Sequence, residues 1–154
     1  MLKNESRGIV MELDFNAPII PLEGLGGIKL YSKLNDLKEE LALKDEERYV
    51  GIKQIYYTVQ EKIGLVFNAK NEKLMIISAK NGYEGKLYGK IGLGTLEEEL
   101  LQLCPNFVYE EFEEIWVDYE NCISIVTDPE TSEIIRINLF LPETKLPDFD
   151  EGNW

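Results

Sequence analysis

Apolar and polar positions along the chain follow two periods, and the same order of periods occurs twice. Leucines at helical spacing in residues 34–43 and 93–102 form one apolar stripe in each segment, which predicts two short helices. Alternating, β-branched runs predict three strands after each helix. We expect these strands near residues 50–59, 62–68 and 73–79, and near 113–119, 122–127 and 133–140. The alternating residues 9–15 predict one more strand.

The two halves of the chain also resemble each other. KLYSKL at residues 29–34 recurs as KLYGKI at 86–91, and residues 55–77 align with 115–137 without a gap. Two copies favour a duplicated unit. We expect a single domain over residues 1–154, with pseudo-repeat 1 at about 9–80 and pseudo-repeat 2 at about 81–142. Residues 143–154 are expected to form an irregular tail with a weakly anchored end.

This order of elements predicts an α+β fold. We expect a tandem repeat of a helix plus three antiparallel strands, giving one antiparallel sheet with helices on one face and a partly solvated second face. Asp36 and Thr95 are the expected N-caps of the two helices, with Glu39 and Glu98 at the N3 positions. Pro105 is expected to end the second helix.

Several parts of this pattern resemble known families. The segment KIGLGTLEEEL, followed by a helix, an acidic-aromatic strand and a hairpin, resembles the repeat of the BamE-like outer-membrane lipoproteins. Two such units in tandem resemble the beta-lactamase inhibitor proteins. The acidic, aromatic character resembles bacterial immunity proteins of contact-dependent growth inhibition and related polymorphic toxin systems. Because the chain shows no leader and no lipidation cysteine near its start, the inhibitor families are the closer expectation, and they imply no catalytic residues.

Charge narrows the choice of partner. The net charge is −13, and residues 91–154 carry Arg136 and Lys145 against 16 carboxylates. Such a surface repels nucleic acid and anionic membranes, so a basic protein is the natural partner. Solubility alone could also explain the charge. We expect a cytoplasmic protein, because no secretory signal is recognisable, with Cys104 and Cys122 as reduced thiols.

Catalytic and ligand-binding signatures are absent from the sequence. The chain has no histidine, the commonest general base and metal ligand. The glycine-rich residues 24–30 and 89–95 do not match a phosphate loop, and the carboxylate clusters lack the spacing of a calcium loop. We therefore expect no catalytic residues, no cofactor and no metal.

The acidic stretch YEEFEEIWVDYEN, residues 109–121, is the predicted binding site. It holds six carboxylates in thirteen positions. Read as a strand, its residues Ile115, Val117 and Tyr119 should face the core. The opposite, solvated face should carry the centre of a partner-binding surface: Trp116, Glu114, Asp118 and Glu120. Residues expected to steer the partner from the edge are Tyr109, Glu110, Glu111 and Glu113.

These observations predict a non-enzymatic inhibitor: an immunity protein that neutralises a basic bacterial toxin, possibly a nuclease domain. Two alternatives stay open. The first is a structural scaffold module whose sheet edge pairs with itself in a homodimer. The second is an enzyme that uses carboxylates, which would need a concave pocket and an acid with a strongly raised pKa.

Overall fold

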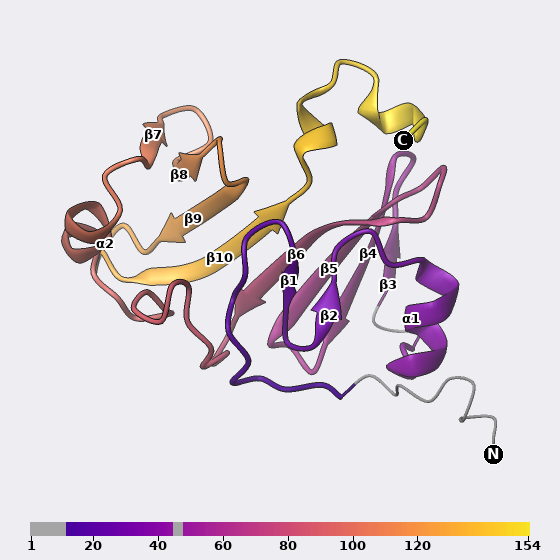
Figure 1. The fold of residues 1–154 in the computed structure, drawn as a ribbon, viewed down its shortest axis with the longest axis horizontal. Coiled ribbons are helices and arrows are strands. Elements are labelled where there is room, and N and C mark those ends of the chain that lie inside the picture. Colours follow the sequence, from indigo (N-terminus) through magenta and orange to yellow (C-terminus); the bar gives the residue numbers. More distant parts are fainter. Residues whose placement is uncertain (1–11, 45–47) are drawn as a thin grey trace.

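A computed structural model describes residues 12–44 and 48–154 (Figure 1). Its main element is an eight-stranded antiparallel sheet in the order β3-β4-β5-β6-β10-β9-β8-β7. The bounds are β3 (Arg48–Val50), β4 (Gln54–Val59), β5 (Ile63–Asn68), β6 (Leu74–Lys80), β7 (Val108–Glu110), β8 (Ile115–Asp118), β9 (Ile123–Thr127) and β10 (Ile134–Phe140). Strands β6 and β10 pair at the centre, so the two halves of the chain share one continuous sheet.

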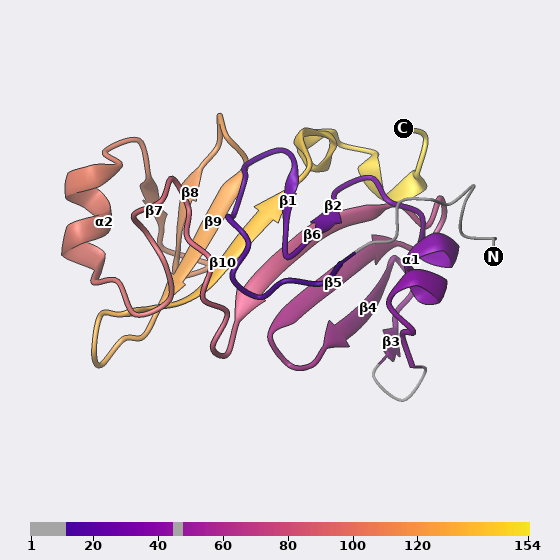
Figure 2. The ribbon, with the colours of Figure 1, turned by 60° about the horizontal axis from the view of Figure 1, so that its bottom comes forward.

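Smaller elements surround this sheet. Strands β1 (Gly24–Leu25) and β2 (Ile28–Lys29) form a separate two-stranded sheet, and this segment crosses one face of the large sheet over β6 (Figure 2). The helices are α1 (Leu34–Glu40) and α2 (Glu97–Leu103). Two 3-10 turns, η2 (Pro142–Lys145) and η3 (Phe149–Glu151), end the chain.

The predicted fold class is wrong. Within the described residues the protein is mostly β, with two seven-residue α-helices. It is not a tandem repeat of a helix plus three strands, because four strands follow each helix. Residues 50–59 were expected to form one strand, but a tight turn separates β3 from β4. The strand expected at 113–119 is β8, which begins only after a tight turn that follows the unpredicted strand β7. Gly51 N–H donates to Gln54 O at 2.8 Å, and Glu114 N–H donates to Glu110 O at 2.8 Å. Strands β3 and β7 have three residues each, too few to show alternation of their own.

The expected helix caps are wrong as well. The N-cap positions are Lys33 and Leu96, and neither side chain caps its helix. Asp36 lies inside the first turn of α1, where its charge favours the helix dipole. The Thr95 hydroxyl instead accepts the N–H of Gly92 at 3.1 Å and closes the turn before α2.

The core lies on the sheet face that the N-terminal segment crosses. Side chains that alternate along the central strands are fully buried there: Ile63, Leu65, Phe67, Ile77, Ile123, Ile125, Ile137 and Leu139. Tyr83 holds the N-terminal segment in place, because its hydroxyl donates to Ala17 O at 2.6 Å and accepts the N–H of Gly26 at 2.8 Å. The strand expected at residues 9–15 begins outside the described residues, and residues 12–15 are not in a strand.

The C-terminal tail is anchored, contrary to the expectation of a loose end. Asn68 is fully buried at the β5–β6 turn, and its amide donates to Phe149 O at 3.1 Å and Asp150 O at 3.3 Å. Lys73 Nζ donates to Trp154 O at 2.7 Å. The tail therefore packs against the β5–β6 turn. In the part of the chain that the structure describes, no helix is long and apolar enough to span a membrane.

Candidate protein-binding site

The β7–β8 hairpin carries the densest group of carboxylates. Strand β7 ends at Glu110 and β8 begins at Ile115, so residues 111–114 form the turn between them. Glu114 has a φ of 59°, in the left-handed region, and its N–H returns to Glu110 O. This tight turn projects the side chains of four consecutive residues outward, and all four are exposed.

Phe112 stands at the tip of this turn. Its side chain is 95% exposed, more than any other large hydrophobic residue among those described. Glutamates flank it on both sides in the sequence EEFEE. Sequence reasoning missed Phe112 because it treated these residues as part of a connection and a strand. The signal was present, since an aromatic residue between two pairs of acids has no apolar neighbour to pack against.

Trp116 does not project into solvent as predicted. It is half-buried, and its indole Nε1–H donates to Glu97 Oε2 at 2.6 Å. Its ring also packs on Tyr109, with centroids 5.0 Å apart. Because Glu97 is the first residue of α2, this side of β8 faces the helix. Glu114 lies near the same group in a shallow hollow.

Asp118 is buried, with 4% of its surface exposed, so the expectation that it lies on a solvated face is wrong. Its carboxylate accepts the N–H groups of Glu120 and Asn121, each at 3.1 Å, and the Asn121 side-chain amide at 2.8 Å. Asp118 therefore closes the β8–β9 turn. Glu120, two residues further on, is exposed.

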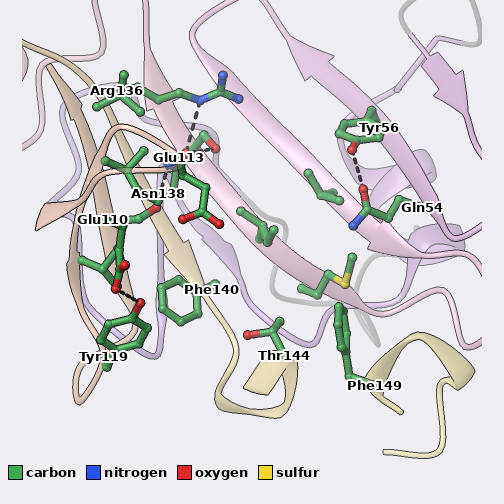
Figure 3. Close-up of a pocket in the computed structure, with 18 residues that line it drawn as sticks. Gln54, Tyr56, Glu110, Glu113, Tyr119, Arg136, Asn138, Phe140, Thr144 and Phe149 are labelled. Carbon is green, nitrogen blue, oxygen red and sulfur yellow. Dashed lines mark hydrogen bonds between the residues drawn. The ribbon is translucent and has the colours of Figure 1, made fainter. Parts of the chain in front are cut away.

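The predicted core face of β8 instead borders the open face of the sheet. Ile115, Val117 and Tyr119 line a hollow of about 620 Å³ there, together with Glu110 and Glu113 (Figure 3). Val117 is buried, but Tyr119 is exposed. The Tyr119 hydroxyl donates to the Glu110 carboxylate. That hydrogen bond, followed by desolvation and the charges of Glu110 and Glu113, raises the pKa of Tyr119.

One half-buried residue, Glu110, and its exposed neighbours make up the solvent-facing part of this region. We call it the acidic hairpin surface, and it consists of Tyr109, Glu110, Glu111, Phe112, Glu113, Glu114, Tyr119 and Glu120. Within the described ranges, no lysine or arginine forms an ion pair with any of its carboxylates. The structure thus brings together six of the eight predicted site residues on this surface, and it assigns Trp116 and Asp118 to the support of the hairpin.

We also searched the described residues for a metal-binding group and for reactive cysteines. Among the residues that the structure describes, no group of three or more acids and cysteines is arranged to hold a metal ion. Cys104 and Cys122 are both free. Burial raises the pKa of each thiol, and the carboxylate of Asp118 raises it further, which favours the unreactive protonated form.

Comparison with known proteins adds evidence on the fold alone. No family model and no curated protein matches the sequence. A solved structure of a cysteine-rich secretory protein from Staphylococcus aureus subsp. aureus Mu50 is similar, with a TM-score of 0.51 and 13% sequence identity. The similarity covers 85% of this chain and 50% of the staphylococcal chain, so this chain spans about half the length of that protein. The resemblances to lipoproteins, lactamase inhibitors and immunity proteins remain predictions.

Proposed function

We propose that this chain is a non-enzymatic inhibitor of immunity-protein type that neutralises a basic toxin domain. The observation that carries the proposal is the exposure of Phe112. This aromatic side chain lies at the tip of the β7–β8 hairpin, and the two residues on each side of it in the sequence are glutamates. Exposing such a ring to water is unfavourable. A partner protein that buries it would recover this free energy.

The chemistry of the surface suggests what kind of partner would bind. Buried aromatic anchors contribute most of the binding energy in many interfaces, and charged residues around them guide association. On this hairpin the surrounding charges are negative and have no cationic partners among the described residues. A basic protein would satisfy them, and association would be faster at low salt.

A nuclease domain is the partner that we favour. Nuclease grooves are positive because they bind phosphates, and the carboxylates of Glu110, Glu111 and Glu113 could occupy such a groove in place of phosphate charge. A cytoplasmic location belongs to the same proposal, because a toxin that degrades nucleic acid must be blocked there.

The test first asks whether a neighbouring gene encodes a basic toxin domain, as the proposal requires, and then measures the affinity of this protein for that domain. Phe112→Ser is expected to weaken binding about 30-fold, mainly through faster dissociation. Ile52→Ser is the matched control, because Ile52 is 91% exposed at the tip of the corresponding β3–β4 hairpin but lacks flanking acids. Equal effects of the two substitutions, or none from Phe112→Ser, would contradict the proposal.

Charge reversal tests the electrostatic part. Glu111→Lys with Glu113→Lys is expected to slow association and to flatten its dependence on salt. Glu23→Lys with Glu84→Lys, at two exposed sites outside the hairpin, is the control that makes the same change in net charge. An unchanged salt dependence in the hairpin double variant would mean that the acids do not meet a basic partner.

A second candidate function is homodimerisation through the edge of the sheet. Among the described residues, strand β3 lies at one edge of the large sheet, and its residues Tyr49 and Val50 are exposed. Edge strands can pair with a second copy of the chain. Mass measurement in solution separates the two functions: a tight dimer that Val50→Lys dissociates supports the scaffold, and a monomer supports the inhibitor. The carboxylate enzyme stays a prediction.

A further inference from the structure

The open face of the sheet carries two positive charges side by side near its centre. Lys80 on β6 and Arg136 on β10 are direct cross-strand partners, so their side chains project from the same face. Both are half-buried. Burial, followed by the charge of Arg136, lowers the pKa of Lys80. Like charges placed opposite each other destabilise a sheet, so this pair is unfavourable as it stands.

No carboxylate of the described chain neutralises the pair. The Nε–H of Arg136 donates to Asn138 Oδ1 at 3.2 Å, and neither cation forms an ion pair within residues 12–44 and 48–154. Glu61 acts on Lys80 only through its more distant charge. In a chain with 29 acids and 16 bases, two adjacent cations without an acidic partner need an explanation.

Gly64 leaves room beside the two cations. It lies in β5, and its backbone is not in the left-handed region that requires glycine. A Cβ atom built on Gly64 would lie 3.6 Å from Arg136 Nη2 and 3.8 Å from Lys80 Cε, at ordinary contact distance. Glycine inside a strand is unfavourable and often marks a place that a ligand approaches closely.

A chain of hydrogen bonds holds Arg136 in position. Ser78 Oγ donates to Asn138 Oδ1 at 2.6 Å, and Asn138 Nδ2 donates to Ser124 Oγ at 2.9 Å. Asn138 is therefore fixed from both sides, and it fixes the Nε edge of Arg136 (Figure 3). The terminal guanidinium nitrogens of Arg136 and the ammonium of Lys80 remain as donors.

The hollow beside this group has apolar walls along the central strands, and the carboxylates of Glu110 and Glu113 line it beside β8. Arg136 lies at its end opposite Thr144 and Phe149 (Figure 3). Between them the lining includes Val66, Met75, Ile76, Val117, Val126 and Phe140. Its volume of about 620 Å³ falls in the range of small-molecule sites, which combine apolar walls with a few placed polar groups.

We propose that this hollow binds a small organic carboxylate with an apolar body. The carboxylate is held by Arg136, which lines the hollow, and by its cross-strand neighbour Lys80, which lines the adjoining hollow. The apolar body lies along Val66 and Ile76. A planar guanidinium suits a carboxylate because it can donate two parallel hydrogen bonds. The bound negative charge would also relieve the repulsion between the two cations. This proposal does not rest on the inhibitor function, since it needs no protein partner, but Glu110, Glu113 and Tyr119 belong to both the hollow and the acidic hairpin surface.

The probe is hexanoate, titrated into the full-length protein and followed by amide chemical shifts. The expected result is saturable shifts in β5, β6 and β10, with hexanol and hexylamine binding at least about tenfold more weakly because they lack the anion. Inorganic phosphate is also titrated. Phosphate binding as tight as hexanoate binding would overturn the proposed role of the apolar body, and weaker binding supports it.

Two variants separate binding from folding. Arg136→Gln should weaken hexanoate binding at least about tenfold, and Lys86→Gln, which removes one exposed charge elsewhere, should leave it unchanged. Gly64→Ala should also weaken binding while the midpoint of thermal unfolding stays the same or rises, because alanine fits the strand. Absence of saturable shifts in the wild-type protein, or unchanged affinity in both site variants, would overturn the proposal.

Discussion

Trp116 donates its indole N–H to the carboxylate of Glu97 across a distance of 2.6 Å. This hydrogen bond joins β8 to the first residue of α2. Trp116, which was predicted to lie at the centre of the binding surface, therefore supports the hairpin. Phe112 is the exposed aromatic side chain at the hairpin tip.

We therefore predict that Trp116→Phe lowers the stability of the protein and leaves partner binding nearly unchanged. The phenyl ring can still pack on Tyr109, but it cannot donate to Glu97, so the free energy of unfolding should fall by about 1 kcal/mol. Urea unfolding measures the loss. A variant of unchanged stability that binds the partner much more weakly would show that Trp116 contacts the partner directly.

Asp118 should behave as a structural residue. Its carboxylate accepts three hydrogen bonds from Glu120 and Asn121 in a nearly solvent-free position. Asp118→Ala should lower the free energy of unfolding by about 1–3 kcal/mol, because it leaves these donors without a partner. Glu120→Ala, at an exposed position, should change it by less than about 0.5 kcal/mol. Comparable losses in the two variants, measured by urea unfolding, would contradict this role.

Asn68 should anchor the tail through its amide nitrogen alone. Its Oδ1 accepts the N–H groups of Lys70 and Asn71 in the β5–β6 turn, while its Nδ2 donates to Phe149 and Asp150. Asn68→Asp keeps the acceptor and removes the donor. We expect a folded protein whose tail is released and cleaved faster by proteases, as followed by mass spectrometry.

The β9–β10 turn shows that the carboxylate of an aspartate can accept the same backbone hydrogen bonds as Asn68 Oδ1 does in the β5–β6 turn. Asp128, sixty residues after Asn68, accepts the N–H groups of Glu130 and Thr131 through its Oδ1. Asp128→Asn is the control, since it keeps the Oδ1 acceptor of the β9–β10 turn at a position that makes no hydrogen bond to the C-terminal tail. Equal proteolysis of the tail in the Asn68→Asp variant and the wild-type protein would mean that other contacts, such as that of Lys73 with Trp154, are sufficient.

Tyr83 should make the free energy of unfolding depend on pH in the alkaline range. Burial is the main cause that raises its pKa from 10.0 to about 12. Between these values the folded protein keeps a proton that the unfolded chain has lost, so the stabilisation is complete below pH 10 and disappears as pH rises through about 12. Tyr83→Phe should therefore reduce the slope of stability against pH in this window.

The neutral-pH effect of Tyr83→Phe provides a second check. The substitution leaves Ala17 O and Gly26 N–H without their partner, which should lower the free energy of unfolding by about 1–3 kcal/mol. Tyr31→Phe is the comparison variant, because the pKa of Tyr31 is also raised to about 12 but its hydroxyl donates to the Glu143 side chain and no backbone group depends on it. An unchanged alkaline slope in the Tyr83 variant would exclude it as the titrating group.

Much of the local structure could be predicted from patterns in single segments. Strands β5, β6, β9 and β10 lie within a residue of their predicted positions, because each is a continuous, mainly apolar run that contains β-branched residues. Strand β3 was merged with β4, and strand β7 was not predicted, because a strand of three residues is too short to show alternation of its own. The prediction of three strands for each helix, in place of four, followed from these two short strands.

The candidate site was also predicted only in part. The sequence identified residues 109–121 as the unusual region, because its carboxylates have no cations beside them. It did not identify Phe112, and it placed Trp116 and Asp118 on a solvated face. The sequence could not predict that Lys80 and Arg136 are neighbours. The two residues are 56 positions apart and meet only because β6 and β10 pair.

By itself, the sequence determined which residues of each strand share a face, where most strands lie, and how strongly the second half of the chain is charged. Only the tertiary structure decided which face of β8 is covered. Alternation divides a strand into two faces, but both faces of β8 carry apolar residues, so the pattern is the same whichever one is buried. The choice depends on α2, whose Glu97 accepts the hydrogen bond of Trp116, and that contact exists only once the chain has folded.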